Sequence, residues 1–320
     1  MATKIMLVGE PMELFIAQTE GALENVPSFS SAVAGAEFNV AVGLSRLGHS
    51  VGYLSKLGKD PFGKHIAQVM EENGIGSSLI CYSEENFTGF MMKSKVSHGD
   101  PEIFYFRKNS AASTISCADI DQVDFSKFGF LHMTGIFPAL SDITLEAAEY
   151  LINRARKSGL TLSFDPNLRP QLWRSSEKMV STINKFAENV DYFLPGTKEG
   201  EILMGSRDPE KIADFYLEKG AKNVVVKLGP NGAYLKNRQT SFYSPAFQED
   251  RFVDTVGAGD GFAAGLISSI AEGLLLEDAV RRGNAIGTIQ IMSVGDNNGL
   301  PTREELASFM NTHKQISRRE

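Results

Sequence analysis

The chain has 320 residues, of which 42% are hydrophobic and 22% are charged. This length suits one large α/β domain or two ordinary ones, and the composition is typical of a folded globular protein, not of a disordered chain. The net charge of −7 disfavours a protein that binds the backbone of nucleic acid, although a small anionic ligand needs only a local positive field.

The two cysteines, Cys81 and Cys117, do not form a CxxC pair. So few cysteines indicate a reducing compartment, not a disulfide scaffold. The apolar run at residues 5–8 is followed directly by Gly9 and Glu10, which is too early for a signal peptide. No stretch reaches the roughly 18 apolar residues that a membrane-spanning helix needs. We therefore expect a cytoplasmic protein with no membrane or nucleic-acid partner.

The N-terminal third predicts alternating strands and helices and then a series of strands. Residues 12–33 look irregular, with short alternating stretches, and Gly48 and Gly74 are placed to end two helices. In chain order the expected elements are a strand over 5–8, a helix over 37–47, a strand over 51–57, a helix over 62–73, and strands over 79–82, 89–96 and 102–107. A polar turn at 97–101 joins the last two strands. We expect them to form an antiparallel hairpin because no helix lies between them.

After this hairpin the alternation of strands and helices resumes. The expected elements are strands over 128–133, 160–164, 191–194 and 224–228, and helices over 141–157, 175–188, 208–219, 258–275, 277–292 and 302–313, so that the C-terminal third is mainly helical. Repeated strand–helix units predict a largely parallel sheet with helices on both faces. We therefore expect one α/β domain over residues 1–320, with a small β lid from about residues 12–33 and 86–110.

The most informative segment is the glycine-rich loop at residues 254–262, Asp-Thr-Val-Gly-Ala-Gly-Asp-Gly-Phe, which leads into a predicted helix. Glycines let a ligand approach the backbone closely, and the positive end of a helix dipole suits an anion such as a phosphoryl group in transit. Asp260 lies in the first turn of that helix and could take the proton of an attacking hydroxyl. The alternative is a tight turn with a helix-capping acid.

The complete string resembles the C-terminal signature of the ribokinase-like (PfkB) family of carbohydrate kinases, which disfavours the capping alternative. Further segments resemble the family in the same order, over nearly the whole chain: residues 34–41, 165–169, 194–199 and 225–232. The resemblance implies a three-layer α/β/α sandwich with a mostly parallel central sheet and a small β lid. It also implies ATP and Mg²⁺ as cofactors, a monovalent cation such as K⁺ as a further candidate, and a homodimer formed through the lid.

The resemblance assigns roles on the sugar side of the site. Asp260 is the expected base, and the N–H groups of Gly257, Ala258 and Gly259 form the expected anion hole. Gly35 and Asn39 are expected to touch the sugar, because a glycine admits the ligand and an amide can both donate and accept hydrogen bonds. For Asn39 the alternative is an amide on the helix surface.

On the nucleotide side, the resemblance places Lys227, Gly229, Gly232 and Asn284 beside ATP. For the segment from Lys227 to Gly232 the alternative is a hairpin turn next to a lysine with a buried stem. Glu199 is expected to hold Mg²⁺, through water because Mg²⁺ retains its waters readily. Many relatives have Asn where this chain has Gly196, and the alternative for Glu199 is a solvated residue at a helix end.

Three segments narrow the subgroup: residues 104–113, 131–141 and 165–173. They resemble those of 2-keto-3-deoxygluconate kinases and, nearly as much, those of bacterial fructokinases. Arg107 and Arg169 offer charge-assisted partners for a substrate carboxylate, with a surface ion pair as the alternative for either. Tyr105 shares the strand face of Arg107. Phe90 stands where some sugar-acid kinases have a polar aromatic residue, which removes one hydrogen bond.

Together these features predict an ATP-dependent kinase that converts 2-keto-3-deoxygluconate to its 6-phospho product. Fructokinase is the main alternative, and 5-dehydro-2-deoxygluconokinase or ribokinase is less favoured. A non-catalytic sugar- or nucleotide-binding regulator is the alternative from another class, and the presence of Asp260 with its glycine loop weighs against it. The chain lacks a GxxxxGK[ST] loop, an HExxH pair, a GxSxG elbow and a GxGxxG after its first strand.

Overall fold

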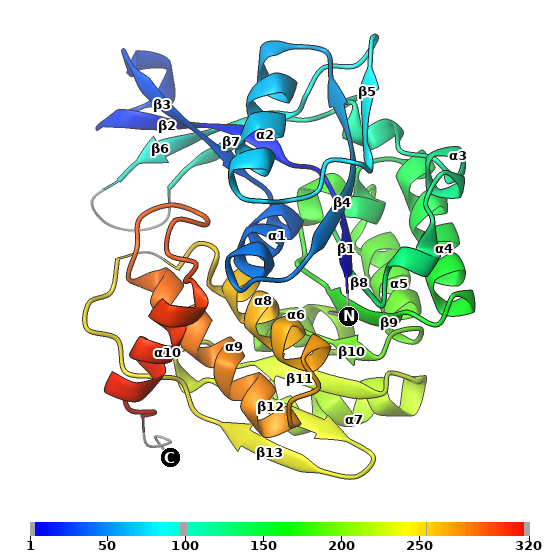
Figure 1. Ribbon diagram of the computed structural model, residues 1–320, viewed down its shortest axis with the longest axis vertical. Helices are drawn as coiled ribbons and strands as arrows, with labels where there is room; N and C mark the ends of the chain where they lie inside the picture. Colours follow the sequence, from blue (N-terminus) through cyan, green and yellow to red (C-terminus); the bar gives the residue numbers. More distant parts are fainter. Residues whose placement is uncertain (1–3, 97–100, 254, 317–320) are drawn as a thin grey trace.

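The computed structural model describes residues 4–96, 101–253 and 255–316. Its main feature is a central sheet with helices on both faces, and a smaller sheet stands at one end of it (Figure 1). Among the described residues, nine strands form the central sheet in the order β13-β12-β11-β10-β9-β8-β1-β4-β5. The strands from β11 to β5 run parallel to one another, and β12 and β13 add an antiparallel edge.

The central sheet is built from short runs of apolar residues, as expected for strands that are covered on both faces. All four residues of β1 are fully buried. The strands are β1 (Ile5–Val8), β4 (Val51–Gly58), β5 (Ile80–Ser83), β8 (Phe130–Thr134), β9 (Thr161–Asp165), β10 (Tyr192–Phe193), β11 (Asn223–Lys227), β12 (Ala233–Asn237) and β13 (Ser241–Ser244). Ile5 and Leu7 face one hydrophobic core, and Met6 and Val8 face the other.

The helices divide between these two cores. The bounds of the ten helices in the described chain are α1 (Ala36–Arg46), α2 (Pro61–Glu72), α3 (Cys117–Asp121), α4 (Asp142–Lys157), α5 (Ser176–Ala187), α6 (Thr197–Met204), α7 (Pro209–Lys219), α8 (Ala258–Ala271), α9 (Leu276–Ile291) and α10 (Arg303–Thr312). Helices α3 to α7 contribute to one core, and α1, α2, α8, α9 and α10 contribute to the other. The result is a three-layer α/β/α sandwich (Figure 1).

Local capping explains several helix boundaries. The Ser141 hydroxyl accepts a hydrogen bond from the N–H of Thr144 at the start of α4, and the Asp60 carboxylate accepts one from Gly63 at the start of α2. Such caps satisfy N–H groups that have no partner within the helix. Gly159, directly after α4, has a φ of +76°, which a glycine adopts without strain.

The small sheet has four strands in the described chain, in the order β3-β2-β6-β7. They are β2 (Met12–Glu20), β3 (Phe29–Ala34), β6 (Phe90–Lys95) and β7 (Ile103–Phe106). β2 pairs antiparallel with β3 and parallel with β6, and β6 pairs antiparallel with β7. Because β2 follows β1 after only three residues, this sheet begins at the carboxyl end of the central sheet. Met12, Leu14 and Met91 form its own small core.

Several sequence expectations need correction. Residues 12–33 are not irregular, because they contain β2 and β3, which pair along the small sheet. The strand expected over 79–82 lies outside the small sheet and pairs with β4 at the edge of the central sheet. The hairpin of β12 and β13 was not predicted, nor were α3 and α6.

Of the turn expected over 97–101, residues 97–100 lie outside the described residues. The antiparallel pairing of the strands on either side of it, β6 and β7, is confirmed. In the described part of the chain, no helix combines the length and the apolar character that crossing a bilayer requires.

Candidate active site

Two cavities, each of about 380 Å³, meet at the start of α8. The first is lined mainly by polar residues from the carboxyl ends of β1 and β9, from α1 and from the small sheet. The second is lined mainly by apolar residues and glycines from the β11–β12 turn, from the segment after β13, and from α8 and α9. Both cavities are lined by Lys227, Thr255 and Gly259. A ligand that occupied both would therefore pass the first turn of α8.

The start of α8 requires glycine for a steric reason. Gly257 has a φ of +77°, and a Cβ added there would lie 2.2 Å from the backbone oxygen of Asp296. The N–H of Ala258 donates to Thr255 O over 3.3 Å, so it is not free for the anion hole that was expected from Gly257, Ala258 and Gly259; the N–H of Gly261 donates to Gly257 O over 2.8 Å. The N–H groups of Gly259 and Asp260 belong to the first turn, where the helix itself offers no acceptor four residues back.

Lys227, at the end of β11, brings positive charge to the same place. A Cβ added to Gly259 would lie 3.8 Å from Lys227 Nζ, so the absence of a side chain leaves room beside the ammonium group. First-turn N–H groups, the helix dipole and a lysine together form a site that favours an anion. Asp254, the first residue of the glycine-rich loop, lies outside the described residues.

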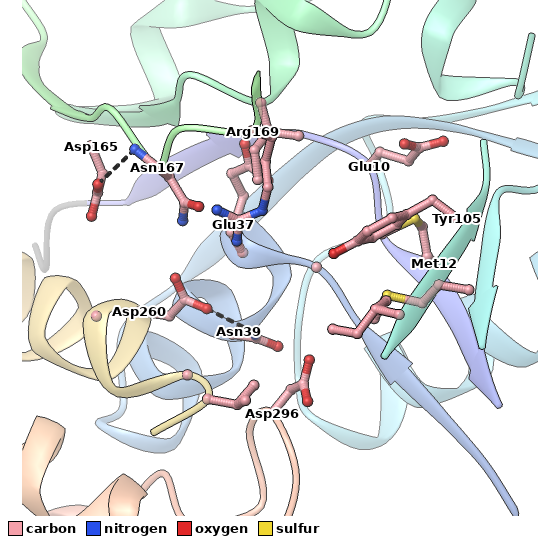
Figure 2. Close-up of a pocket in the computed structure, with 18 of the residues that line it drawn as sticks. Glu10, Met12, Glu37, Asn39, Tyr105, Asp165, Asn167, Arg169, Asp260 and Asp296 are labelled. Carbon is pink, nitrogen blue, oxygen red and sulfur yellow. Dashed lines mark hydrogen bonds between the residues drawn. The ribbon is translucent and has the colours of Figure 1, made fainter. Parts of the chain in front are cut away.

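Asp260 lines the first cavity from the first turn of α8 (Figure 2). Asn39 donates from Nδ2 to Asp260 Oδ2 over 2.8 Å. Loss of contact with water raises the pKa of Asp260 to about 7, and the charge of Asp165 also raises it, whereas the Asn39 hydrogen bond, Arg169 and Lys227 lower it. A carboxylate that titrates near neutral pH can both accept a proton and release it, which suits general-base catalysis.

A buried ionic cluster joins β9, β11 and the start of α6. Lys227 Nζ lies 2.5 Å from Asp165 Oδ2, at the carboxyl end of β9. Burial lowers the pKa of Lys227, but Asp165 and Glu199 raise it further, so that the net shift is upward and the lysine stays charged. The cluster therefore holds a cation at the point where the two cavities meet.

Glu199 links the start of α6 to the loop after β9 through two hydrogen bonds. Its Oε2 accepts a hydrogen bond from Gly196 N over 2.7 Å, and its Oε1 accepts one from Leu168 N over 3.0 Å. Burial raises its pKa, although Lys227 and the two backbone hydrogen bonds oppose that shift. Glu199 is therefore not the solvated helix-end residue of the alternative interpretation. It lines the first cavity while it ties the start of α6 to the loop after β9.

All the residues expected to touch the sugar line the first cavity: Gly35, Asn39, Tyr105, Arg107 and Arg169. Figure 2 shows Asn39 beside Asp260, and Tyr105 together with Met12 projecting from the small sheet. Asn39 is not a surface amide, because only 3% of it is exposed.

The two arginines differ in their partners. Arg107 is buried and forms an ion pair with Glu10, with Nε 2.7 Å and one terminal nitrogen 2.5 Å from Glu10 Oε2. The only hydrogen bond that Arg169 makes to another described residue is from a terminal nitrogen to Leu168 O, 2.9 Å away. Within the described chain Arg169 forms no salt bridge to a carboxylate, although its charge acts on Asp260, so its guanidinium is available to a ligand in this cavity.

The residues expected beside the nucleotide line the second cavity: Lys227, Gly229, Gly232 and Asn284. The hairpin alternative for this segment also holds, because Leu228 N donates to Gly232 O over 2.8 Å where β11 turns into β12. Asn284 is buried and donates to Ser244 O over 2.9 Å. That hydrogen bond ties α9 to the end of β13, so the amide group of Asn284 has a structural function as well.

The sequence-based prediction missed four acidic residues that line the first cavity: Glu10, Glu37, Asp165 and Asp296. Glu37 is buried, and burial raises its pKa while the hydroxyl of Thr134 donates to its Oε1. Glu37 and Asp165 lie inside the family-like segments 34–41 and 165–169, next to buried strands, which is the signal in the sequence that marks them. Asp296 lies in a loop without a motif, so nothing in the sequence marks it.

The comparisons with known proteins agree on one family. The model of the pfkB family carbohydrate kinases matches residues 2–303. A 2-dehydro-3-deoxygluconokinase from Bacillus subtilis is 49% identical over 96% of this chain and 95% of its own length.

Solved structures show the same relationship. The PfkB protein from Polaromonas sp. JS666 is 44% identical and covers 96% of this chain and 100% of its own, with a TM-score of 0.89. A putative ribokinase II from E. coli, in complex with ATP and Mg²⁺, is 24% identical with a TM-score of 0.88 over 97% of this chain and 100% of its own, a likeness that concerns the fold. The predicted ribokinase-like fold is thereby confirmed, and the chain belongs to the pfkB family of carbohydrate kinases.

Proposed function

We propose that this protein transfers the γ-phosphoryl group of ATP to a hydroxyl of 2-keto-3-deoxygluconate. The observation that carries the proposal is the position of Asp260, a carboxylate in the polar cavity whose own helix turn adjoins the second cavity. The sugar acid would occupy the first cavity, and the nucleotide would occupy the second with its phosphates at Lys227 and Gly259. In-line transfer needs this arrangement of acceptor, phosphoryl group and donor.

The protein's own groups account for the chemical step. Asp260 accepts the proton of the attacking hydroxyl while the sugar oxygen bonds to phosphorus and the bond to the ADP oxygen breaks. The N–H groups of Gly259 and Asp260 and the Lys227 ammonium group stabilise the negative charge of the moving group. Asp260 then releases the proton to solvent, which its pKa of about 7 makes easy near neutral pH.

Mg²⁺ fits this site as an ion held by phosphates and water. In the described chain no group of three or more His, Cys, Asp or Glu residues could hold a metal ion by itself. Mg²⁺ commonly keeps several waters and binds through substrate phosphates, where it neutralises charge. Glu199 and Asp165 are the acids that would hold its water shell. Relatives of the same fold that were solved with ATP, with Mg²⁺ or with a potassium ion support a nucleotide and cations as ligands.

The preferred sugar follows from two observations. The 49% identity to a 2-dehydro-3-deoxygluconokinase extends over nearly both full lengths, whereas the similar fructokinases from plants are 28–29% identical. Arg169 is a cation with no carboxylate partner in the described chain, and a substrate carboxylate would supply that partner. Fructose has no carboxylate, so fructokinase activity would leave this arginine without an anionic partner.

We also propose that the small sheet acts as a lid and forms the interface of a homodimer in the cytoplasm. It stands over the first cavity with Tyr105 and Met12 in its lining (Figure 2). Its edge strand β7 carries Phe104 and Phe106, which are 48% and 45% exposed. An edge strand with exposed aromatic residues is suited to pairing with a second sheet. Closure over the cavity would exclude water from the reaction.

The test is Asp260→Asn, assayed over a panel of 2-keto-3-deoxygluconate, fructose, ribose, tagatose and nucleosides. The wild-type protein should phosphorylate the keto acid with the highest kcat/KM, and the variant should lose about 10²- to 10⁴-fold in kcat while it retains ligand affinity. Absence of ATP consumption with every sugar would favour the non-catalytic regulator. A higher kcat/KM for fructose would favour fructokinase.

A further inference from the structure

A chain of side-chain amides connects the small sheet to Asp260. Asn39, on α1, donates from Nδ2 to Asp260 Oδ2 over 2.8 Å. Asn297, in the loop between α9 and α10, donates from Nδ2 to Asn39 Oδ1 over 3.0 Å. Asn297 Nδ2 also donates to the backbone oxygen of Val33, on β3, over 3.1 Å. No sequence motif includes Asn297. None of these hydrogen bonds joins Asn297 directly to Asp260.

The direction of the hydrogen bonds in this series of amides follows from the acceptors at its two ends, Val33 O and the Asp260 carboxylate. Val33 O is a carbonyl and can only accept, so the amide nitrogen of Asn297 must face it. The same nitrogen then donates to Asn39, which must present its oxygen to Asn297 and its nitrogen to Asp260. Asn39 can form both hydrogen bonds, one to Asn297 and one to Asp260, only in this one orientation. Asn297 therefore holds the Asn39 amide in the one orientation that the ionised Asp260 carboxylate can use, because a carboxylate only accepts.

The backbone of the Asn297 loop is held by other groups. Arg46 donates to Asn297 O over 3.1 Å and to Leu300 O over 2.8 Å. Gln290 Nε2 donates to Gly295 O over 2.7 Å. These contacts use backbone oxygens, so a change in the Asn297 side chain should leave the path of the loop intact.

We propose that Asn297 is a positioning residue for the catalytic base: it obliges Asn39 to donate to Asp260 Oδ2 and so directs the other carboxylate oxygen toward the sugar. This inference rests on the proposed function, in which Asp260 is the base. Within the described chain no hydrogen bond uses Asp260 Oδ1, which leaves that oxygen to accept the proton of the attacking hydroxyl. Asn297 acts through Asn39 and need not touch the reacting atoms.

The same arrangement influences the charge state of the base. The charged groups with the largest effect on the pKa of Asp260 are Asp165 on β9, Arg169 in the following loop and Lys227 on β11. The Asn39 hydrogen bond is the largest influence that lowers the pKa of Asp260 against the effect of burial. If Asn39 turned its oxygen toward Asp260, this contribution would be lost and the pKa would rise.

The experiment is the nearly isosteric change Asn297→Asp. A carboxylate cannot donate, so Asn39 should rotate, donate to Asp at position 297 and present its oxygen to Asp260. We expect kcat with the sugar to fall by about 10- to 100-fold. The acid limb of the kcat–pH profile should move to higher pH, and KM for ATP should stay unchanged. Asn298→Asp is the matched control, because exposed Asn298 donates only to Val294 O in the same loop.

A double-mutant cycle separates positioning from a merely structural role. If Asn297 acts through Asn39, then Asn297→Asp should have no further effect on kcat or on the pH profile in an Asn39→Ala background. Independent, additive losses, or a fall in kcat without movement of the acid limb, would overturn the proposal. Should Asn297→Asp fail to fold, Asn297→Ala should give a smaller loss with a shift in the same direction, and an unchanged profile would overturn the proposal.

The outcome is distinguishable from failure of the proposed function. If the wild-type protein phosphorylates no sugar, the proposed function itself fails. If the wild-type protein is active and Asn297→Asp behaves like Asn298→Asp, only the positioning role of Asn297 fails.

Discussion

At the scale of single residues, the first cavity is an unusual concentration of acids and bases. Asp260, Asp165 and Glu199 lie around one lysine, and burial works against the charged form of each group whose shift is resolved. A folded protein tolerates such a cluster when the charges are paired or when function requires them. The cluster therefore lowers the stability of the folded protein, a cost that a purely structural site would not carry.

The first residue-scale prediction concerns stability and pH. An unfolded chain loses the Asp260 proton near pH 4, whereas the folded protein keeps it up to about pH 7. Between these values the folded state binds more protons, so this residue makes stability fall as pH rises. Asp260→Asn removes the effect, and its Tm should exceed that of the wild type more at about pH 8 than at about pH 5. A Tm difference that does not change with pH would contradict this.

The second residue-scale prediction concerns the substrate carboxylate. Arg169→Ala removes a charge-assisted hydrogen bond, which should raise KM for the keto acid by about 10- to 100-fold and change KM for fructose much less. Steady-state kinetics with both sugars measure the difference. Arg174→Ala is the control, since Arg174 is exposed and pairs with Asp142 at the surface. Equal losses for the two sugars would argue against a carboxylate contact.

At the scale of elements, α8 combines a buried, firmly packed body with a first turn that lines both cavities. Its residues from Gly261 to Ser269 are buried, so the helix is held firmly between α1 and α9. Its first turn remains at the cavities because Gly257 ends the preceding loop in a left-handed conformation. A site that is built on a rigid element keeps its geometry when the ligand binds.

The two faces of the small sheet carry different side chains, and this difference bears on assembly. The face of the sheet toward the cavity carries Tyr105 and Ile103, whereas Phe90 and Phe106 stack on the other face with their ring centroids 4.6 Å apart. Phe62 of α2 packs against Phe90 and covers part of this aromatic cluster. Phe104 remains about half exposed, so the outer face is only partly covered by the chain itself.

The element-scale prediction follows from this exposed edge. Phe104→Glu places a charge where the proposed dimer would bury an aromatic ring, and it should shift the protein toward the monomer. Sedimentation velocity over a range of concentrations measures the shift. Leu275→Glu changes an exposed apolar residue at the start of α9, 71% exposed, and should not alter association. A monomeric wild-type protein would contradict the proposed dimer directly.

At the scale of the whole molecule, the site exists only where distant segments meet. The carboxyl ends of β1, β9 and β11 bring Glu10, Asp165 and Lys227 to one edge of the central sheet. The small sheet and α8 then enclose this edge from two sides (Figure 1). Lys227 is the residue on which this assembly depends most, because it pairs with Asp165 and balances Glu199.

The whole-molecule prediction is that Lys227→Met destabilises the protein as well as weakening ATP binding. Removal of the lysine leaves Asp165 and Glu199 without their buried partner, which should cost about 3–5 kcal/mol of unfolding free energy. Urea denaturation measures this loss. Lys222→Met breaks an exposed pair with Asp191 and should cost only about 0–1 kcal/mol. A loss for Lys227→Met as small as that of the control would show that the cluster does not support the fold.

The alternation of apolar strands and capped helices determined most of the central sheet and its helices in advance. These features are local, because burial on both faces of a strand and the spacing of apolar residues on a helix appear directly in the sequence. The glycine loop before α8 marked Asp260 and Gly259 for the same reason, since the signature is continuous. The expectation failed for β2 and β3, because they pair with each other and β2 also pairs with the distant β6, which their own composition does not reveal.

Only the tertiary structure decided which polar groups meet. Arg107 and Arg169 look equivalent in the sequence, yet one is paired with Glu10 and the other is not. Asn297 lies 258 residues from Asn39 along the chain, so nothing in its neighbourhood marks it as part of the site. Hydrogen bonds and ion pairs act over a few ångströms, and contacts between distant segments therefore arise only after the sheet and helices have packed.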